Sequence, residues 1–269
     1  MEFRTIVDIA KPEFSIEPCE ELLFVGSCFA DSIGQRFREE GFPVTVNPYG
    51  TMYNPASVLH TIEKYEGKPR TAFITLGTNH VYRLKETGEI VDNCEKRPQA
   101  LFQEEELSVD ACADYLRQAI TVLRGRRPDV RVVMTVSPIR YRKYGYHESQ
   151  VSKATLLLAI EKVLPSDGIA GHCTYFPAYE IVMDELRDYR FYAADMLHPS
   201  AQAVEYIWER LVESYFSLEA KAFLDEWRPL KQALGHKPFN PDSEEYRALM
   251  DKTMLKVAEL RKKYSTFAL

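Results

Sequence analysis

The sequence predicts an α/β protein in which a doubly wound, mostly parallel β-sheet is followed by a helical C-terminal extension. Three apolar segments of strand length, 22–25, 71–77 and 130–136, each end at a glycine or run into a turn that contains proline. Between them lie segments whose apolar residues recur with the 3.6-residue period of amphipathic helices. This alternation is typical of a parallel sheet, because each parallel connection needs a crossover that is usually a helix.

The stretch 22–30, LLFVGSCFA, organises the chain. A buried strand ends at a glycine and turns at once into a helix, whose inner face carries Phe29, Ile33 and Phe37. The turn brings Ser27 and Cys28 to the carboxyl edge of the sheet, where α/β proteins form their sites. Free backbone N–H groups and the positive end of the helix dipole favour a thiolate or an oxyanion there.

The remaining elements of the α/β part follow from periodicity and from turn residues. Residues 1–20 read as an extended lead-in, and 84–107 as a polar, irregular segment with a small hairpin around 87–88. Ser108 is the expected N-cap of a helix over 108–124. A turn followed by a short strand is predicted over 41–46, and a further short strand at 173–176. A loop is predicted at 141–150, and helices at 56–64, 152–164, 178–187 and from Pro199 onward.

The last part of the chain has helical patterns only. Residues 218–234 and 243–264 read as two helices with no further strand, so we expect an α/β domain over 1–216 and a helical extension over 217–269. Leu249, Leu255 and Leu260 form an apolar stripe on the second of these helices. This stripe suits a helix docked on the body, or on a second subunit in a homodimer.

Composition excludes several classes of protein. The net charge of −6 argues against nucleic-acid binding, which needs a basic face. No apolar run approaches the length of a membrane span, and residues 1–8 show no apolar core of a signal peptide. The five cysteines, at positions 19, 28, 94, 112 and 173, lack metal-ligand spacing. We therefore expect free thiols, a cytoplasmic protein and no metal.

Asp195 and His198 indicate a catalytic site. They lie three residues apart, just before Pro199 and a helix. The carboxylate can bind Nδ1 of the imidazole and leave Nε2 free as a general base. A nucleophile near the start of a domain and Asp-x-x-His near its end is typical of hydrolases and acyltransferases. The backbone N–H of Gly50 and the amide of Asn79 are the candidate oxyanion donors.

Four further residues are candidate substrate contacts: His80, Arg83, Arg140 and His147. Each also has a simpler interpretation, because loop histidines are mostly solvated and arginines beyond strand ends can form a basic rim. The arginines could instead hold an anionic substrate or a coenzyme A phosphate. The tyrosines within 47–54 could line a sugar-binding wall or simply pack a turn.

The motif at 26–30, GSCFA, together with TLGT at 75–78 and VSPIR at 136–140, resembles the GSCFA family. The segments 152–158 and 188–199 are similar too, and the likeness covers roughly 20–215. That family is grouped with the SGNH (GDSL-like) hydrolases. The resemblance implies a flavodoxin-like three-layer α/β/α sandwich and ester chemistry.

The SGNH sequence blocks map onto this chain residue by residue. The nucleophile of the Gly-Asp-Ser block corresponds to Cys28, and Ser27 falls where that block has aspartate. Gly50 and Asn79 correspond to the second and third blocks. Asp195 and His198 match the last block directly. Cysteine suits thioester or acyl-transfer chemistry, so Cys28 is favoured, but if Ser27 faces the site then Cys28 is only a small buried apolar residue.

We therefore expect an esterase that acts on an ester or thioester through a covalent acyl-enzyme, with carbohydrate esters among the candidate substrates. One alternative is an acyltransferase that moves an acetyl group from coenzyme A to a carbohydrate with the same residues. Another is a non-catalytic binding or scaffold module. No cofactor is expected, apart from coenzyme A in the transferase alternative.

Overall fold

A five-stranded parallel sheet forms the centre of the protein, which we describe from a computed structural model over residues 4–92, 97–166 and 168–269. Its strand order is β2-β1-β3-β7-β8, the flavodoxin-like order, so the predicted fold class is confirmed. The strands are β1 (Leu22–Gly26), β2 (Val44–Val46), β3 (Thr71–Leu76), β7 (Arg131–Val136) and β8 (Cys173–Tyr175).

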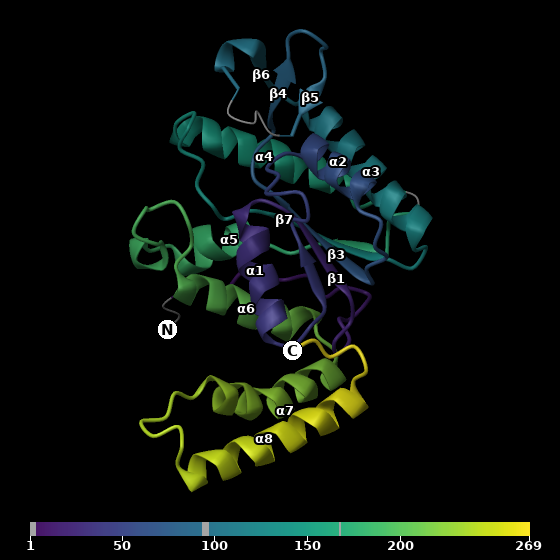
Figure 1. Ribbon diagram of the computed structural model, residues 1–269. Helices are drawn as coiled ribbons and strands as arrows, with labels where there is room; N and C mark the ends of the chain where they lie inside the picture. The colour runs from purple at the N-terminus through teal and green to yellow at the C-terminus, as the bar shows by residue number, and fades with distance from the viewer. Residues whose placement is uncertain (1–3, 93–96, 167) are drawn as a thin grey trace.

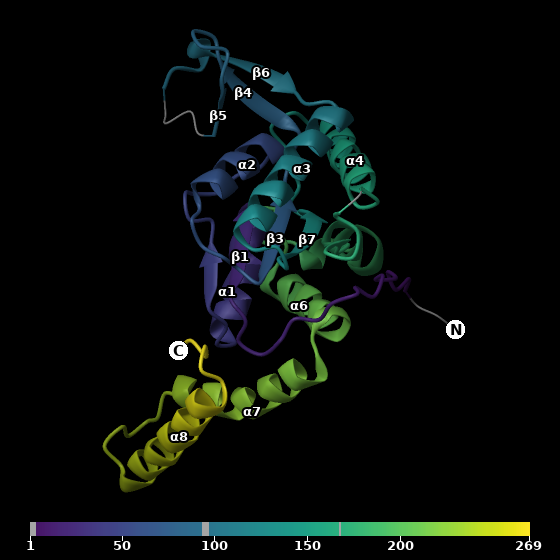
Figure 2. The same cartoon turned by 90° about the vertical axis from the view of Figure 1, so that its right-hand side faces the viewer.

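Helices cover both faces of this sheet (Figures 1 and 2). One face packs against α1 (Cys28–Glu39) and α6 (Ala201–Tyr215). The other face packs against α2 (Pro55–Lys64), α3 (Val109–Arg126) and α4 (Tyr146–Val163).

Successive strand side chains alternate between the two faces, which divides the core into two clusters. On β1, Phe24 points to the α1–α6 side and stacks on Phe73 at a centroid distance of 4.4 Å. Phe37 of α1 meets Trp208 of α6 edge-to-face at 4.8 Å. Leu23 points the other way and packs with α2 and α3. The two fully covered faces explain why the strands read as continuous apolar runs.

A second, antiparallel sheet stands at the carboxyl edge of the first (Figure 1). It consists of β4 (His80–Leu84), β5 (Ile90–Val91) and β6 (Phe102–Glu106), the last preceded by a 3-10 turn, η1 (Gln99–Leu101). The hairpin around 87–88 is therefore present, but the description of 84–107 as otherwise irregular was wrong. β6 has the sequence FQEEE with only Phe102 buried, so apolar alternation does not reveal it.

Two other boundaries differ from the sequence prediction. Helix α4 begins at Tyr146 rather than at 152, and the predicted loop 141–150 is shortened accordingly. Gly145, at φ +88°, precedes the helix, and its first turn is exposed and so carries no apolar signal. The helix predicted at 178–187 is present as α5 (Ala178–Glu180) continued by a π-helical segment, η2 (Ile181–Leu186), before the 3-10 turn η3 (Tyr189–Phe191).

The C-terminal extension is a hairpin of α7 (Leu218–Gly235) and α8 (Glu244–Lys263). The inner face of α8 carries Thr253, Val257 and Leu260, whereas Leu249 and Leu255 are exposed. The predicted stripe of Leu249, Leu255 and Leu260 is therefore not one buried face. The six-residue spacing between Leu249 and Leu255 puts them on different sides of a helix.

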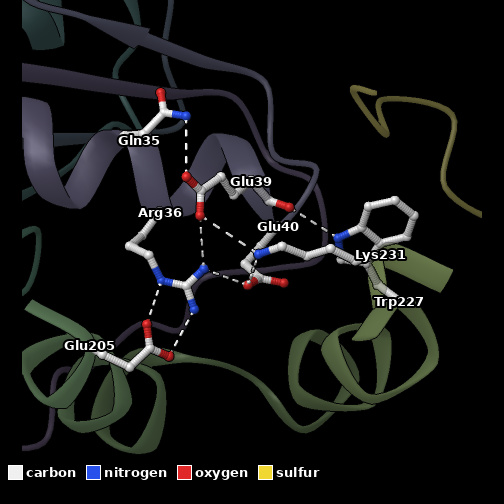
Figure 3. A network of polar contacts seen from close by, with 7 residues as sticks. All are labelled: Gln35, Arg36, Glu39, Glu40, Glu205, Trp227 and Lys231. Atoms are coloured by element: carbon white, nitrogen blue, oxygen red, sulfur yellow. Dashed lines mark hydrogen bonds and ion pairs between the residues drawn. The ribbon is translucent and has the colours of Figure 1, made fainter. Parts of the chain in front are cut away.

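Helix α7 docks on the C-terminal end of α1 through a polar network (Figure 3). Trp227 Nε1 donates to the Glu39 carbonyl at 3.1 Å, and Lys231 Nζ lies 2.9 Å from Glu40 Oε1. Arg36 bridges Glu40 to Glu205 of α6. The extension is thus fixed to the α/β body by charged groups as well as by apolar packing.

This docking surface is remote from the start of α1. Trp227 contacts Glu39, the last residue of the helix, whereas Cys28 is the first. A helix of 12 residues is about 18 Å long. The hairpin and the second sheet lie at opposite ends of the central sheet (Figure 1). Within the described residues, no helix combines the length and apolarity needed to cross a membrane.

Candidate active site

The turn after β1 separates the roles of Ser27 and Cys28. Gly26 has φ +141°, and a Cβ there would lie 2.1 Å from the Thr75 carbonyl oxygen, so only glycine fits. Ser27 is 1% exposed. Its Oγ caps the helix by accepting from Phe29 N at 3.3 Å and pairs with Thr75 Oγ1 at 3.1 Å. Cys28 begins α1 and is partly exposed. Ser27 therefore holds the turn, and Cys28 is the nucleophile-capable group that faces outward.

The thiol of Cys28 has a phenol as its neighbour. Tyr53 Oη lies 3.4 Å from Cys28 Sγ. A cleft of about 400 Å³ adjoins Tyr53. Three of its aromatic side chains form a row, because Tyr53 and Tyr141 have ring centroids 6.2 Å apart, and Tyr141 and Tyr144 are 5.5 Å apart. We call Tyr53, Tyr141 and Tyr144 the tyrosine row.

Asp195 and His198 form an oriented carboxylate–imidazole pair. Asp195 Oδ2 lies 2.5 Å from His198 Nδ1. The other carboxylate oxygen accepts from the backbone N–H of His198 at 3.0 Å and of Leu197 at 2.9 Å. These hydrogen bonds, the one from His198 N first, lower the pKa of Asp195 to about 2. The carboxylate therefore stays ionised at neutral pH, and Nε2 of His198 is left for chemistry.

The strand register brings this pair to the same edge as Cys28. Gly26 pairs with Thr75, and Leu76 pairs with Val136, so the carboxyl ends of β1, β3 and β7 lie side by side. Cys28 follows β1 directly. Arg140, in the segment after β7, binds the loop that carries His198.

Arg140 makes two contacts with that loop. Its backbone N–H donates to the Leu197 carbonyl at 3.0 Å, and its Nη1 donates to the Met196 carbonyl at 3.1 Å. Its guanidinium also lies over Tyr146 at 4.2 Å. Arg140 lines a smaller hollow of about 260 Å³, but its hydrogen bonds identify it first as the residue that positions the Asp195–His198 loop.

The two oxyanion donors proposed from sequence have other partners in the structure. The Gly50 N–H donates to the Asn47 carbonyl at 2.9 Å, within the turn that Gly50 closes at φ +97°. Asn79 is buried, and its Nδ2 donates to the Leu107 carbonyl at 2.8 Å. The Asn79 amide carries two N–H donors, and this hydrogen bond uses one of them. The role of both residues as oxyanion donors stays a prediction, although each has a partner inside the fold. Motif spacing cannot reveal this, because it does not show where an N–H points.

The candidate substrate contacts differ in their surroundings. His80 lines the cleft and stacks on Tyr144 at 3.9 Å, and burial lowers its pKa. Arg83 pairs with Glu105 at 2.9 Å on the second sheet and lines a neighbouring hollow instead. The His147 side chain is 86% exposed, so the solvated interpretation fits better, but the residue lies in the first turn of α4 and not in a loop.

The family of the chain follows from a comparison with protein-family models. Residues 21–73 and 67–211 match the GSCFA family, which includes the turn of Cys28 and the Asp195–His198 loop. The chain belongs to the GSCFA family. Residues 227–269 also match the C-terminal domain of GSCFA domain proteins, which covers most of the α7–α8 hairpin. The comparison with curated proteins gives no match.

Solved structures similar to this GSCFA protein include proteins named as esterases and lipases. A candidate platelet activating factor from Streptococcus pneumonia is 14% identical, with 74% of this chain and 84% of that chain covered and a TM-score of 0.47. A candidate GDSL-like lipase from Parabacteroides merdae is 11% identical, with coverages of 76% and 98% and a TM-score of 0.47. A carbohydrate esterase family 2 enzyme from Corynascus thermopiles is 13% identical, with coverages of 78% and 67% and a TM-score of 0.44. At these identities the likeness concerns the arrangement of the chain and not the reaction.

The GSCFA structure also reveals a buried lysine that sequence reasoning missed. Lys153 of α4 is buried, and its Nζ donates to the carbonyls of Gly77 at 2.7 Å and Ser137 at 2.8 Å. Burial lowers its pKa to about 7. Lys153 thus joins the carboxyl ends of β3 and β7. The available signal was a lysine on the apolar face that also carries Leu156 and Ile160.

The other three cysteines that the structure describes lie in places that keep them protonated. Burial raises the pKa of the thiols of Cys19, Cys112 and Cys173 to about 12, which keeps them protonated. Cys94, which the sequence predicts to be an unpaired packing residue, lies outside the described residues. Within the described ranges, no group of three or more potential metal ligands comes together.

Proposed function

We propose that this GSCFA protein is an ester or thioester hydrolase in which Cys28 is the nucleophile, His198 the general base and Asp195 the residue that orients it. The observation that carries the proposal is the 2.5 Å pairing of Asp195 Oδ2 with His198 Nδ1 at the sheet edge where Cys28 begins α1. The N–H of Cys28 is among the first in the helix, which have no acceptor inside it. It is therefore available to an oxyanion.

The reaction would proceed in two halves. His198 Nε2 takes the proton from the Cys28 thiol, and the sulfur attacks the carbonyl carbon, whose π electrons move to oxygen. When the oxyanion collapses, the bond to the leaving group breaks, and His198 returns the proton to that group. In the second half, water gives a proton to His198 and attacks the thioester. The carbon–sulfur bond then breaks, and His198 returns this proton to Cys28.

The tyrosine row favours a substrate with a flat apolar face, such as the ring of a sugar ester. Aromatic side chains offer large, rigid apolar faces, and the phenol groups add hydrogen-bonding capacity. A cleft of about 400 Å³ beside Tyr53 has room for one such ring together with a small acyl group. We therefore place carbohydrate esters first among the substrates to be tested.

Acyl transfer is the second candidate function, and the sulfur nucleophile is the reason for it. A thiolate exchanges readily with a thioester, so an acetyl group could pass from coenzyme A to Cys28 and then to a carbohydrate hydroxyl. The same three residues would serve. A non-catalytic binding module is the remaining alternative.

Intact-mass spectrometry tests these functions. We would incubate the wild type, Cys28→Ala, His198→Ala and Ser27→Ala with p-nitrophenyl acetate and with acetyl coenzyme A. The proposal predicts an acetyl adduct on the wild type and on Ser27→Ala, none on Cys28→Ala and slowed formation on His198→Ala. The donor that acylates faster distinguishes esterase from transferase. Neither an adduct nor turnover with either donor would favour the binding module.

A further inference from the structure

The Tyr53 hydroxyl is the side-chain donor nearest to the sulfur among the contacts of Cys28. It lies 3.4 Å from Sγ, while Asn79 and Gly50 donate to Leu107 and Asn47. Resting on the proposed function, we propose that Tyr53 stabilises the Cys28 thiolate and then the oxyanion formed during acylation. The phenol would thus do the work assigned from the family resemblance to the amide of Asn79.

The backbone of Tyr53 is held rigidly in place. Its carbonyl accepts from Gly77 N at 2.7 Å and from Thr78 N at 2.9 Å. Gly77 is in turn fixed by Lys153, which donates to the Gly77 carbonyl. Donors held in advance stabilise developing charge better than donors that must reorient.

Gly77 also allows the ring of Tyr53 to come close. A Cβ on Gly77 would lie 3.1 Å from Tyr53 Cδ1 and 3.3 Å from Tyr53 Cβ. This separation is shorter than ordinary van der Waals contact, so a side chain at position 77 would push the ring by a few tenths of an ångström. The glycine that ends the predicted strand 71–77 therefore has a role in placing the phenol.

The phenol stays protonated at neutral pH. Burial, and then the hydrogen bond with Cys28, raise the pKa of Tyr53 above its ordinary value. A thiolate can only accept, so the O–H of Tyr53 must be the donor once Cys28 is ionised. Hydrogen bonds to charged acceptors are the stronger kind.

The same donor can serve both negative charges. When sulfur attacks, the carbonyl oxygen becomes the oxyanion and is separated from the sulfur by one carbon atom. A hydroxyl that contacts the sulfur is therefore close to the place where the oxyanion forms. Tyr53 donates a hydrogen bond in both states and keeps its proton, so no bond in the phenol breaks.

The test compares Tyr53→Phe with Tyr215→Phe. The control also loses a phenol hydrogen bond, from Tyr215 Oη to the Tyr175 carbonyl at 3.2 Å, but on the edge strand β8. We would measure the rate of alkylation of Cys28 by iodoacetamide from about pH 5.5 to 9.5, where thiols titrate. Peptide mass spectrometry would follow Cys28 apart from the other cysteines.

The proposal predicts that Tyr53→Phe moves the midpoint of the alkylation profile up by about one pH unit, the size expected for a lost hydrogen bond to a charged group. The limiting rate at high pH should not fall, which separates thiolate stability from access. Acylation by p-nitrophenyl acetate should slow by about 10²-fold, as for loss of an oxyanion donor. Tyr215→Phe should leave both readings unchanged, and Gly77→Ala should shift the alkylation midpoint in the same direction but less.

An unchanged alkylation midpoint together with unchanged acylation in Tyr53→Phe would overturn the proposal. A wild type that no ester acylates would overturn the proposed function instead. In that case the alkylation profiles would still decide whether Tyr53 stabilises the thiolate. The two failures are therefore distinguishable.

Discussion

Asp195 Oδ2 lies 2.5 Å from His198 Nδ1, and two backbone N–H groups hold the other oxygen of the carboxylate. The pair is local in sequence, yet its position relative to Cys28 depends on Arg140 and on the register of three strands. This arrangement leads to the first prediction.

Asp195→Asn should lower kcat/KM for p-nitrophenyl acetate by about 10²- to 10⁴-fold, because an amide no longer holds the imidazole in the right tautomer. Asp184→Asn is the matched control, since that carboxylate is exposed and only forms an ion pair with Arg187. Equal activity in the two variants would contradict the assignment of Asp195.

Lys153 should make stability depend on pH in a specific window. Its pKa falls from 10.5 to about 7 in the folded state, so the unfolded chain binds the proton more tightly. Between about pH 7 and 10.5 the unfolded state holds more protons, and the contribution of Lys153 to stability rises with pH. Below that window the cost of the buried charge is fully present.

Urea unfolding of the wild type and Lys153→Met at two pH values tests this sign. Relative to Lys153→Met, the free energy of unfolding of the wild type should increase by about 3 kcal/mol between about pH 7 and 9.5. Lys162→Met, an exposed lysine on the same helix, should follow the wild type. A constant difference between wild type and Lys153→Met would contradict the prediction.

Asn79→Ala distinguishes a structural from a catalytic asparagine. The substitution leaves the buried Leu107 carbonyl without its donor, which should reduce the free energy of unfolding by about 1–3 kcal/mol. The activity of the folded protein should change less than in Tyr53→Phe. A stable Asn79→Ala protein with acylation slowed by about 10²-fold would instead restore the role that the SGNH resemblance implies.

Trp227→Ala should weaken the docking of the C-terminal hairpin. Trp227 is buried, packs on Phe267 at a centroid distance of 5.0 Å and donates to Glu39. Its truncation should cost about 3–5 kcal/mol in urea unfolding. Arg228→Ala, an exposed neighbour, should cost far less. The contact is at the far end of α1 from Cys28. The alkylation profile of Cys28 in the folded Trp227→Ala variant should therefore stay unchanged. A shifted profile would show that the hairpin influences the site.

Elements buried on both sides could be predicted from the sequence, and elements exposed on one side could not. Residues 71–76 and 131–136 are nearly continuous apolar runs, so their strands were predicted within about one residue. The strand FQEEE of β6 and the first turn of α4 carry polar side chains outward and were missed. Their structure depends on neighbours in the fold, such as β4, which pairs with β6 residue by residue.

The sequence by itself determined the parallel α/β fold, the glycine turn before Cys28 and the pairing of Asp195 with His198, because these depend on periodicity, on a backbone angle and on a separation of three residues. Only the tertiary structure decided that Ser27 caps a helix, and that Asn79 and Gly50 donate inside the fold. It also decided that Tyr53 contacts Cys28 and that Lys153 joins the ends of β3 and β7. A hydrogen bond depends on where a donor points after segments far apart in sequence have packed together. The spacing of residues along the chain does not contain that information.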